Sequence, residues 1–196
     1  MSGPGWGKRA QKIRVPASML LGIVFLALMH PSVHSLWIGG AVALAGAGLR
    51  LWAAGHIEKG KSLAQEGPYA FTRNPLYLGS LLMATGVLVA GQGYWLLLPF
   101  GVFYVALYYP VMKTEQKEMQ EKYGEKYREY ARRVPVFIPG LGHSSGTSLE
   151  DTAGKPSTFL WSRVIRNGEH RTVGGLLLIG AFLLVRAMWP VGWPHL

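Results

Sequence analysis

The chain has 196 residues and a formal net charge of +10, and 49% of its residues are hydrophobic whereas only 15% are charged. A soluble domain usually carries about 25% charged residues, so this composition argues against a soluble protein and predicts a membrane protein. The sequence has no cysteine, which excludes disulfides, thiolate catalysis and cysteine-ligated metals. Lys and Arg cluster between long apolar stretches, as in the cytoplasmic loops of membrane proteins. We therefore expect the lipid bilayer, and no nucleic acid, as the partner of this positive charge.

Five apolar runs predict membrane-spanning helices that form an all-α bundle. In chain order they cover residues 15–29, 35–55, 76–90, 94–112 and 173–189. In the second run Gly39, Ala43 and Ala47 recur at four-residue spacing, which permits another helix to approach closely. Gly91-Gln92-Gly93 separates the third run from the fourth, so these two spans are predicted to form an antiparallel hairpin.

The distribution of Lys and Arg predicts the orientation of these spans. Basic residues precede the first span, lie between the second and third, and follow the fourth, whereas residues 30–35 and 91–93 carry none. By the positive-inside rule the N-terminus and both basic connections face the cytoplasm. We expect a multi-pass protein with a cofactor pocket on the cytoplasmic side. The Ala-, Gly- and Leu-rich composition without cysteine favours a bacterial inner membrane.

The part of the chain after the fourth span is predicted to leave the membrane and return to it. Residues 115–133 have the periodicity of a cytoplasmic helix. Residues 140–156 are rich in Gly, Ser and Thr and predict a flexible loop. The expected organisation is a membrane core of residues 1–139, this loop, and a last part of residues 157–196 that combines an amphipathic surface segment over 157–171 with the fifth span.

Turn-forming and chemically active residues concentrate just before the third span. Gly67-Pro68 opens a turn, and Asn74-Pro75 forces extended backbone ahead of the helix, so Pro75 lies in its first turn. The unpaired backbone N–H groups of that turn and the guanidinium of Arg73 together suit a carboxylate. Tyr69 and Tyr77 add aromatic faces that suit adenine or a sulfonium cation.

Glu115 lies at the cytoplasmic end of the fourth span, and the predicted hairpin brings it close to residues 74–77. Its carboxylate suits an ammonium group. Groups for a carboxylate and for an ammonium side by side fit the amino-acid part of a ligand such as S-adenosylmethionine. Two structural alternatives stay open, with Arg73 as an interfacial cation and Glu115 as a solvated helix residue. The histidines lack metal-ligand spacing, so no metal is expected.

Two blocks of this region resemble the signature of isoprenylcysteine carboxyl methyltransferases and related phospholipid methyltransferases. The run from Gly67 to Gly79 is similar to the pattern G-x-Y-x-x-x-R-H-P-x-Y-x-G. The run from Glu115 to Tyr130 is similar to E-E-x-x-L-x-x-x-F-G-x-x-Y-x-x-Y. The resemblance covers residues 45–139 within the core. It implies a small multi-span enzyme that uses S-adenosyl-L-methionine and releases S-adenosyl-L-homocysteine.

The resemblance also implies which residues hold the cofactor, although it assigns no catalytic side chain and no metal. The implied cofactor-binding residues are Lys61, Ser62, Leu63, Ala64, Tyr69, Arg73, Asn74, Pro75, Leu76, Tyr77 and Glu115. The implied reaction is methyl transfer to a lipophilic or membrane-embedded acceptor, which is a lipid or a lipophilic small molecule.

Three positions depart from the pattern of the resembled family. Asn74 replaces a His and does not titrate near neutral pH. Gln116 replaces a second Glu, and Val111 stands where the prenylcysteine enzymes carry a substrate-binding Arg. A carboxylate-bearing prenylcysteine is therefore disfavoured as the acceptor. Two alternatives stay open, a non-catalytic membrane protein with degraded methyltransferase motifs and a membrane reductase of related architecture.

Overall fold

The computed structural model describes residues 6–58, 62–138 and 158–189, apart from the side chains of residues 6–15 and 18. In chain order these residues form α1 (Trp6–Leu28), α2 (Val33–His56), the 3₁₀ helix η1 (Gly67–Ala70), α3 (Pro75–Ala90), the 3₁₀ helix η2 (Tyr94–Leu96), α4 (Leu97–Tyr123), α5 (Glu125–Arg133), α6 (Trp161–Arg166) and α7 (Glu169–Met188). None of the described residues lies in a strand. The predicted all-α class is confirmed.

Three of these segments are long and apolar enough to cross a membrane, namely α2, residues Tyr94–Tyr123 of η2 and α4, and α7. The second half of α1 and the whole of α3 are shorter apolar helices. Each of the five overlaps one of the five apolar runs of the sequence. Large apolar side chains such as Trp37, Leu98 and Leu178 are more than 70% exposed on the outside of the helices, which suits contact with lipid and not with water. The prediction of a membrane protein is confirmed.

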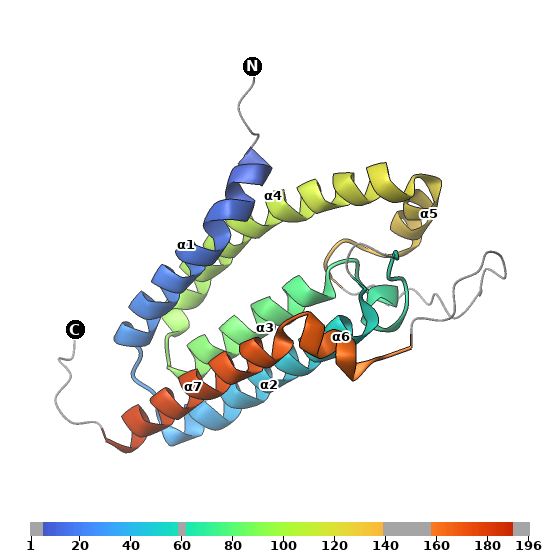
Figure 1. The fold of residues 1–196 in the computed structure, drawn as a ribbon. Coiled ribbons are helices and arrows are strands. Elements are labelled where there is room, and N and C mark those ends of the chain that lie inside the picture. The colour runs from blue at the N-terminus through green and yellow to red at the C-terminus, as the bar shows by residue number, and fades with distance from the viewer. Residues whose placement is uncertain (1–5, 59–61, 139–157, 190–196) are drawn as a thin grey trace.

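The prediction of one separate helix over residues 115–133 is wrong. The fourth span continues without a break as α4 until Tyr123, and α5 is a second helix that turns back beside it (Figure 1). Gly124 separates the two because its φ of 56° is accessible to glycine without the steric cost that other residues incur. The reversal places α5 against the last turns of α4.

The amphipathic helix predicted over residues 157–171 is also shorter than expected. It reduces to α6, and α7 already begins at Glu169, before the predicted start of the fifth span at residue 173. Gly168, with a φ of 80°, makes the turn between them. The predicted loop of residues 140–156 lies outside the described residues, whereas α1 begins at Trp6, well before the predicted start at residue 15.

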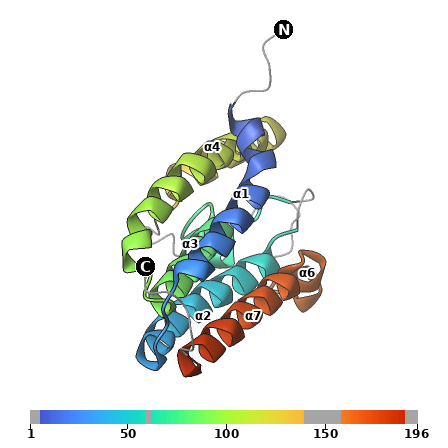
Figure 2. The same cartoon turned by 90° about the vertical axis from the view of Figure 1, so that its left-hand side faces the viewer.

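The helices α2 and α3 lie side by side along their length, and α7 packs on α2 (Figures 1 and 2). Glycine makes the close approach of α2 and α3 possible. A Cβ atom at Gly39 would collide with the backbone of Gly86 and Ala90, and one at Gly46 would meet the backbone of Gly79 and Met83. The small-residue spacing in α2 thus serves helix packing, as the sequence predicts.

Hydrogen bonds fix the end of this helix pair that lies opposite η1. The Ser32 and Ser35 side chains form a capping box at the start of α2, and the Ser35 hydroxyl also donates to the Ala90 carbonyl over 2.7 Å. Beside them, the His30 N–H donates to the Gly91 carbonyl over 2.9 Å. Here an apolar cluster joins α1, α3 and α7 through Phe25, Met29, Leu88 and Leu183.

A matched pair of alanine substitutions in α2 tests the glycine contact. Gly39→Ala should destabilise the protein by about 1–3 kcal/mol, because the added methyl group forces the two backbones apart. Gly40→Ala adds the same methyl group to the same helix, where it would meet no atom within 4 Å, and should be neutral or slightly stabilising through helix propensity. Thermal unfolding in detergent measures both, and equal shifts would contradict the packing role of Gly39.

Candidate functional site

The chain just before α3 is tied to the segment that follows α5. The carbonyl oxygens of residues 135–137 accept hydrogen bonds from the Arg73 N–H, the Asn74 side-chain amide and the Thr72 hydroxyl, over 2.9, 2.8 and 2.9 Å respectively. Asn74 therefore acts as a donor to the backbone, and an amide serves this purpose without any titration. These bonds tie the first sequence block of the predicted cofactor site to the segment that follows the second block.

Tyr77 and Glu115 are direct neighbours, as the predicted hairpin of the third and fourth spans requires. The Tyr77 hydroxyl donates to Glu115 Oε1 over 2.7 Å, which is the length of a strong bond to a carboxylate. The Tyr77 carbonyl accepts a hydrogen bond from the Tyr104 hydroxyl over 2.7 Å, and its ring meets the Tyr108 ring edge-on with centroids 5.6 Å apart. Tyr77 is thus positioned by α4 at three points.

Tyr69 is buried in η1, only 6% exposed, and its hydroxyl has no hydrogen-bond partner among the described residues. Burial raises the pKa of this hydroxyl above its ordinary value of 10.0, the neighbouring Tyr130 and Glu169 raise it further, and Arg50 lowers it. Near neutral pH the group is therefore a hydrogen-bond donor. Leaving a buried donor without an acceptor costs about 1–3 kcal/mol. A buried donor of this kind suits a bound ligand that would accept its hydrogen bond.

The other residues of the predicted set occupy different surroundings. Ala64 is buried in a cluster with Tyr69, and Leu76 packs against that cluster. Leu63 packs instead on the Tyr127 and Tyr130 cluster of α5. Among the rest of the set, Pro75 is buried in the first turn of α3, Ser62 is exposed, and Lys61 lies outside the described residues. The structure thus groups Ala64, Tyr69 and Leu76 around one core and Tyr77 with Glu115.

Arg73 projects toward a different place from the rest of the predicted set. It lines a cavity of about 540 Å³ between α4 and α5, and no other described residue of the predicted cofactor set lines that cavity. Its Nε is buried without a hydrogen-bond partner among the residues that the structure describes. Glu115 does not line this cavity, although both residues stand at the same end of the helix pair.

An ion pair that sequence reasoning missed joins α2 to the start of α7. Arg50 donates from Nε and Nη2 to the two carboxylate oxygens of Glu169 over 2.9 and 2.7 Å. It also donates to the Leu76 carbonyl over 3.2 Å and to the Ser80 hydroxyl. The Glu169 side chain is 6% exposed and that of Arg50 is 19% exposed. The sequence signal was one Arg inside the second apolar run and one Glu just ahead of the fifth. Charged side chains at such positions need a partner of opposite charge.

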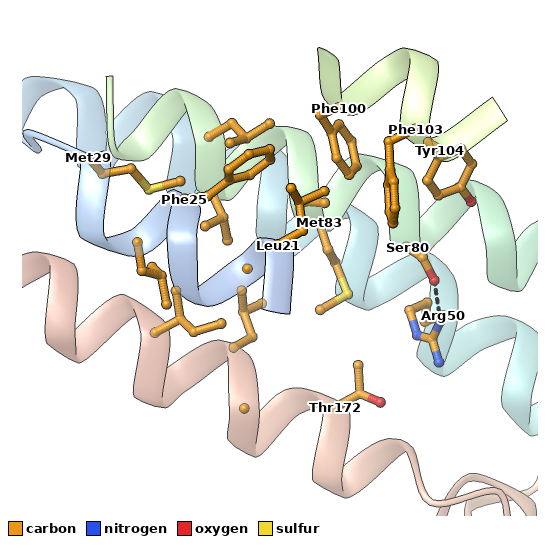
Figure 3. A pocket seen from close by; sticks show the side chains of 18 of the residues that line it. Leu21, Phe25, Met29, Arg50, Ser80, Met83, Phe100, Phe103, Tyr104 and Thr172 are labelled. Carbon is orange, nitrogen blue, oxygen red and sulfur yellow. Dashed lines mark hydrogen bonds between the residues drawn. The ribbon is translucent and has the colours of Figure 1, made fainter. Parts of the chain in front are cut away.

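An apolar cavity of about 400 Å³ lies between α1, α3, α4 and α7. Figure 3 shows Phe25 and Met29 at one end, with Arg50, Ser80 and Tyr104 at the other. Its polar end adjoins the Tyr77 and Glu115 pair, because Tyr104 and Tyr108 line the cavity and also contact Tyr77. The walls suit a hydrophobic group, and the polar end can orient it.

Comparison with known proteins identifies the part of the chain that carries these groups. Residues 42–126 match the model of the phospholipid methyltransferase family, and this segment contains Arg50, Tyr69, Tyr77 and Glu115. The resemblance read from the two sequence blocks is thereby confirmed. No solved structure matches the chain significantly.

Three known proteins are similar to this chain over part of their length. The cobalt-zinc-cadmium resistance protein CzcN of Cupriavidus metallidurans is 34% identical over 55% of this chain and 50% of its own length. The nickel-cobalt-cadmium resistance protein NccN of Alcaligenes xylosoxydans xylosoxydans is 29% identical over 63% and 62%. The protein-S-isoprenylcysteine O-methyltransferase of Schizosaccharomyces pombe is 25% identical over 70% and 60%. The chain thus spans half to three fifths of these relatives.

A double-mutant cycle tests the ion pair between α2 and α7. Glu169→Gln and Arg50→Met should each destabilise the protein by about 3 kcal/mol, because each leaves the partner charge buried without compensation. The combined variant should cost clearly less than the sum of the two, since no unpaired charge remains. Unfolding in mixed detergent micelles measures the three variants, and additive effects would show that the two side chains do not stabilise each other.

Proposed function

Given that residues 42–126 match the phospholipid methyltransferase family, we propose that the chain binds S-adenosyl-L-methionine and transfers its methyl group to a lipophilic acceptor in the membrane. The observation that carries the proposal is the hydrogen bond of Tyr77 to Glu115, together with the buried hydroxyl of Tyr69, which has no hydrogen-bond partner among the described residues. The three residues come from separate parts of the two sequence blocks, and the fold gathers them at one end of the helix pair.

The groups present fit the cofactor chemically. Glu115 offers a negative charge to the ammonium of the amino-acid part. The Tyr69 hydroxyl offers a buried donor to an acceptor atom of the ligand. The Tyr77 ring offers an aromatic face near a cationic sulfonium. Among the remaining predicted residues, Ala64, Pro75 and Leu76 would close the site by packing, and Asn74 would act indirectly by holding residues 135–137 in place.

When bound, the cofactor supplies an electrophilic methyl group. The chain's part is then to orient the acceptor and to exclude water, which accounts for most of the acceleration of such a transfer. The 400 Å³ apolar cavity would hold the hydrophobic part of the acceptor, and Arg50, Ser80 and Tyr104 would set the depth of its polar part. We assign no general base.

The proposed placement in the membrane follows from where the charges lie. The end of α2, the start of α3, the last turns of α4 and the helix α5 all lie at one end of the bundle (Figure 1), and this end carries Lys113, Lys117 and the basic residues of α5. We propose that this end faces the cytoplasm in a multi-pass protein of a bacterial inner membrane. The cofactor would then enter from the cytoplasm and the acceptor from the bilayer.

A charge-matched pair of variants on α4 tests the cofactor site. Glu115→Gln should weaken binding of S-adenosyl-L-homocysteine tenfold or more, about 1.4 kcal/mol, because the amide keeps the hydrogen bond from Tyr77 but loses the negative charge. Glu118→Gln removes the same charge from an exposed position of the same helix and should leave the affinity within twofold. Calorimetric titration of the detergent-purified protein measures both.

Transfer itself is followed with methyl-labelled S-adenosyl-L-methionine and membranes that contain the protein. Label should enter the organic extract with the wild type and with Glu118→Gln, and not with Glu115→Gln. Saturable binding without any label in the extract would favour the non-catalytic alternative. Equal affinity of both variants would remove Glu115 from the site, and binding of a nicotinamide cofactor instead would favour the reductase.

Replacing Tyr69 by phenylalanine separates a ligand-binding role from a structural one. Tyr69→Phe removes a buried hydroxyl without a partner, so the ligand-free protein should become more stable by about 1 kcal/mol. The same variant should bind S-adenosyl-L-homocysteine several-fold more weakly, because the donor that the ligand would satisfy is gone. Thermal unfolding with and without the ligand measures both effects. A variant that loses stability without the ligand and keeps full affinity would contradict this role.

A contribution to metal resistance is a second candidate function, and the names of CzcN and NccN favour it. Among the described residues, no group of three or more His, Asp or Glu could hold a metal ion, so this candidate does not start from a metal site in that part of the chain. The two functions are compatible. Tolerance of cells to cobalt, zinc and cadmium with the wild type or with Glu115→Gln would tell whether such a role depends on methyl transfer.

A further inference from the structure

The second cavity, of about 540 Å³, is walled almost entirely by hydrogen-bond donors. It lies between the last turns of α4 and the returning helix α5, with Arg73 contributed by the loop before α3. Its cationic lining residues are Arg73, Lys113, Lys117, Arg128 and Arg132, and its other lining residues are Gln116, Gln120, Tyr127 and Ala131. No carboxylate of the described residues lines it. We call these nine residues the basic cavity.

The spacing of the cations works against the stability of the helices that carry them. Lys113 and Lys117 are four residues apart on α4, and Arg128 and Arg132 are four residues apart on α5. Like charges at this spacing lie on one helix face and repel each other. Folding α5 back at Gly124 then sets the two pairs against the same cavity. Such an arrangement is unfavourable by itself and becomes favourable when an anion lies between the pairs.

Carboxylates of the described residues compensate this charge only at its rim. Glu125 pairs with Arg128 at 3.1 Å and with Arg132 at 3.9 Å, and all three side chains are more than half exposed. Among the described residues, no carboxylate pairs with Lys113, Lys117 or Arg73. The ammonium of Lys113 lies 4.9 Å from the centre of the Tyr109 ring.

Arg73 gives the basic cavity a partly buried donor. Its side chain lines the cavity from the loop before α3, while its backbone N–H is already bonded to Pro135. The Nε is buried and has no hydrogen-bond partner in the described part of the chain. Solvent does not satisfy this donor, so it points to an acceptor that the described residues do not supply. It is the second observation, besides the clustered charge, that indicates a ligand.

We propose that the basic cavity binds a phosphate group, carried either by the headgroup of an anionic membrane lipid or by a soluble phosphate compound. Phosphate oxygens accept the several hydrogen bonds that Arg, Lys and Gln donate here. The proposed cofactor is a poor occupant because its net charge is positive, and its predicted carboxylate partner Glu115 does not line the cavity. Lys113 follows the apolar part of α4 directly, where a span that crosses the membrane would reach the lipid headgroups.

The proposal is tested by calorimetric titration of the purified full chain in a non-ionic detergent, at constant ionic strength, with two probes. Inorganic pyrophosphate represents a soluble phosphate, and dihexanoyl phosphatidylglycerol represents an anionic headgroup, with dihexanoyl phosphatidylcholine as its zwitterionic reference. The variant Lys117→Gln/Arg132→Gln removes two cavity cations and leaves Arg73 in place. The control Lys126→Gln/Arg133→Gln removes one Lys and one Arg from exposed positions of α5 outside the cavity.

The wild type should bind at least one of the two anionic probes saturably, and the cavity variant should bind it at least tenfold more weakly, whereas the control stays within twofold. Preference for phosphatidylglycerol over phosphatidylcholine assigns a lipid headgroup, and binding of pyrophosphate alone assigns a soluble phosphate. Thermal unfolding verifies that both variants are folded. Absence of saturable binding of both probes, or an equal loss in the control, would overturn the proposal, since the charge would then act only as a diffuse surface.

Discussion

The contact of two helix backbones, α2 against α3, is the constraint on which the rest of the structure depends. Gly39, Gly46, Gly79 and Gly86 remove the side chains that would otherwise hold the helices apart. In a membrane this closeness gains dispersion energy that the hydrophobic effect does not supply. It also sets the position of Arg50, which reaches from α2 across Gly79 to the Ser80 hydroxyl and the Leu76 carbonyl. The candidate site is built on that fixed end.

Much of this arrangement could be predicted from the sequence, because apolar length and loop charge report directly on membrane spans. The neighbourhood of Tyr77 and Glu115 followed from a three-residue connection between two spans. The helix boundaries were harder to predict. Gly124 and Gly168 separate helices through positive φ angles, and a single glycine in a sequence does not reveal its φ angle. The role of Asn74 was inaccessible, because its partner is a backbone carbonyl beyond α5. Likewise, nothing local linked Arg50 to Glu169, 119 residues away.

The two cavities differ in charge and therefore in the ligand that we propose for each. The apolar cavity lies inside the bundle and ends at a polar cluster where Arg50 is neutralised by Glu169. The basic cavity lies between α4 and α5 and keeps most of its positive charge. Arg73 lines the basic cavity and also belongs to the predicted cofactor residues, so the variants of the basic cavity leave it intact.

The hydrogen bonds from residues 72–74 to residues 135–137 turn a linear stretch of chain into a closed ring that contains α3, α4 and α5. The three helices of this ring cannot move apart easily, because the chain is continuous through them and the hydrogen bonds join its two ends. Outside the ring, Tyr69 packs with Ala53 of α2 and with Ala64, and the charges of Arg50 and Glu169 act on the pKa of its hydroxyl. Because the glycine contact holds α2 to α3, which belongs to this ring, α7 is the neighbour that a ligand exchanging at Tyr69 would displace, and that displacement would break the ion pair of Arg50 with Glu169.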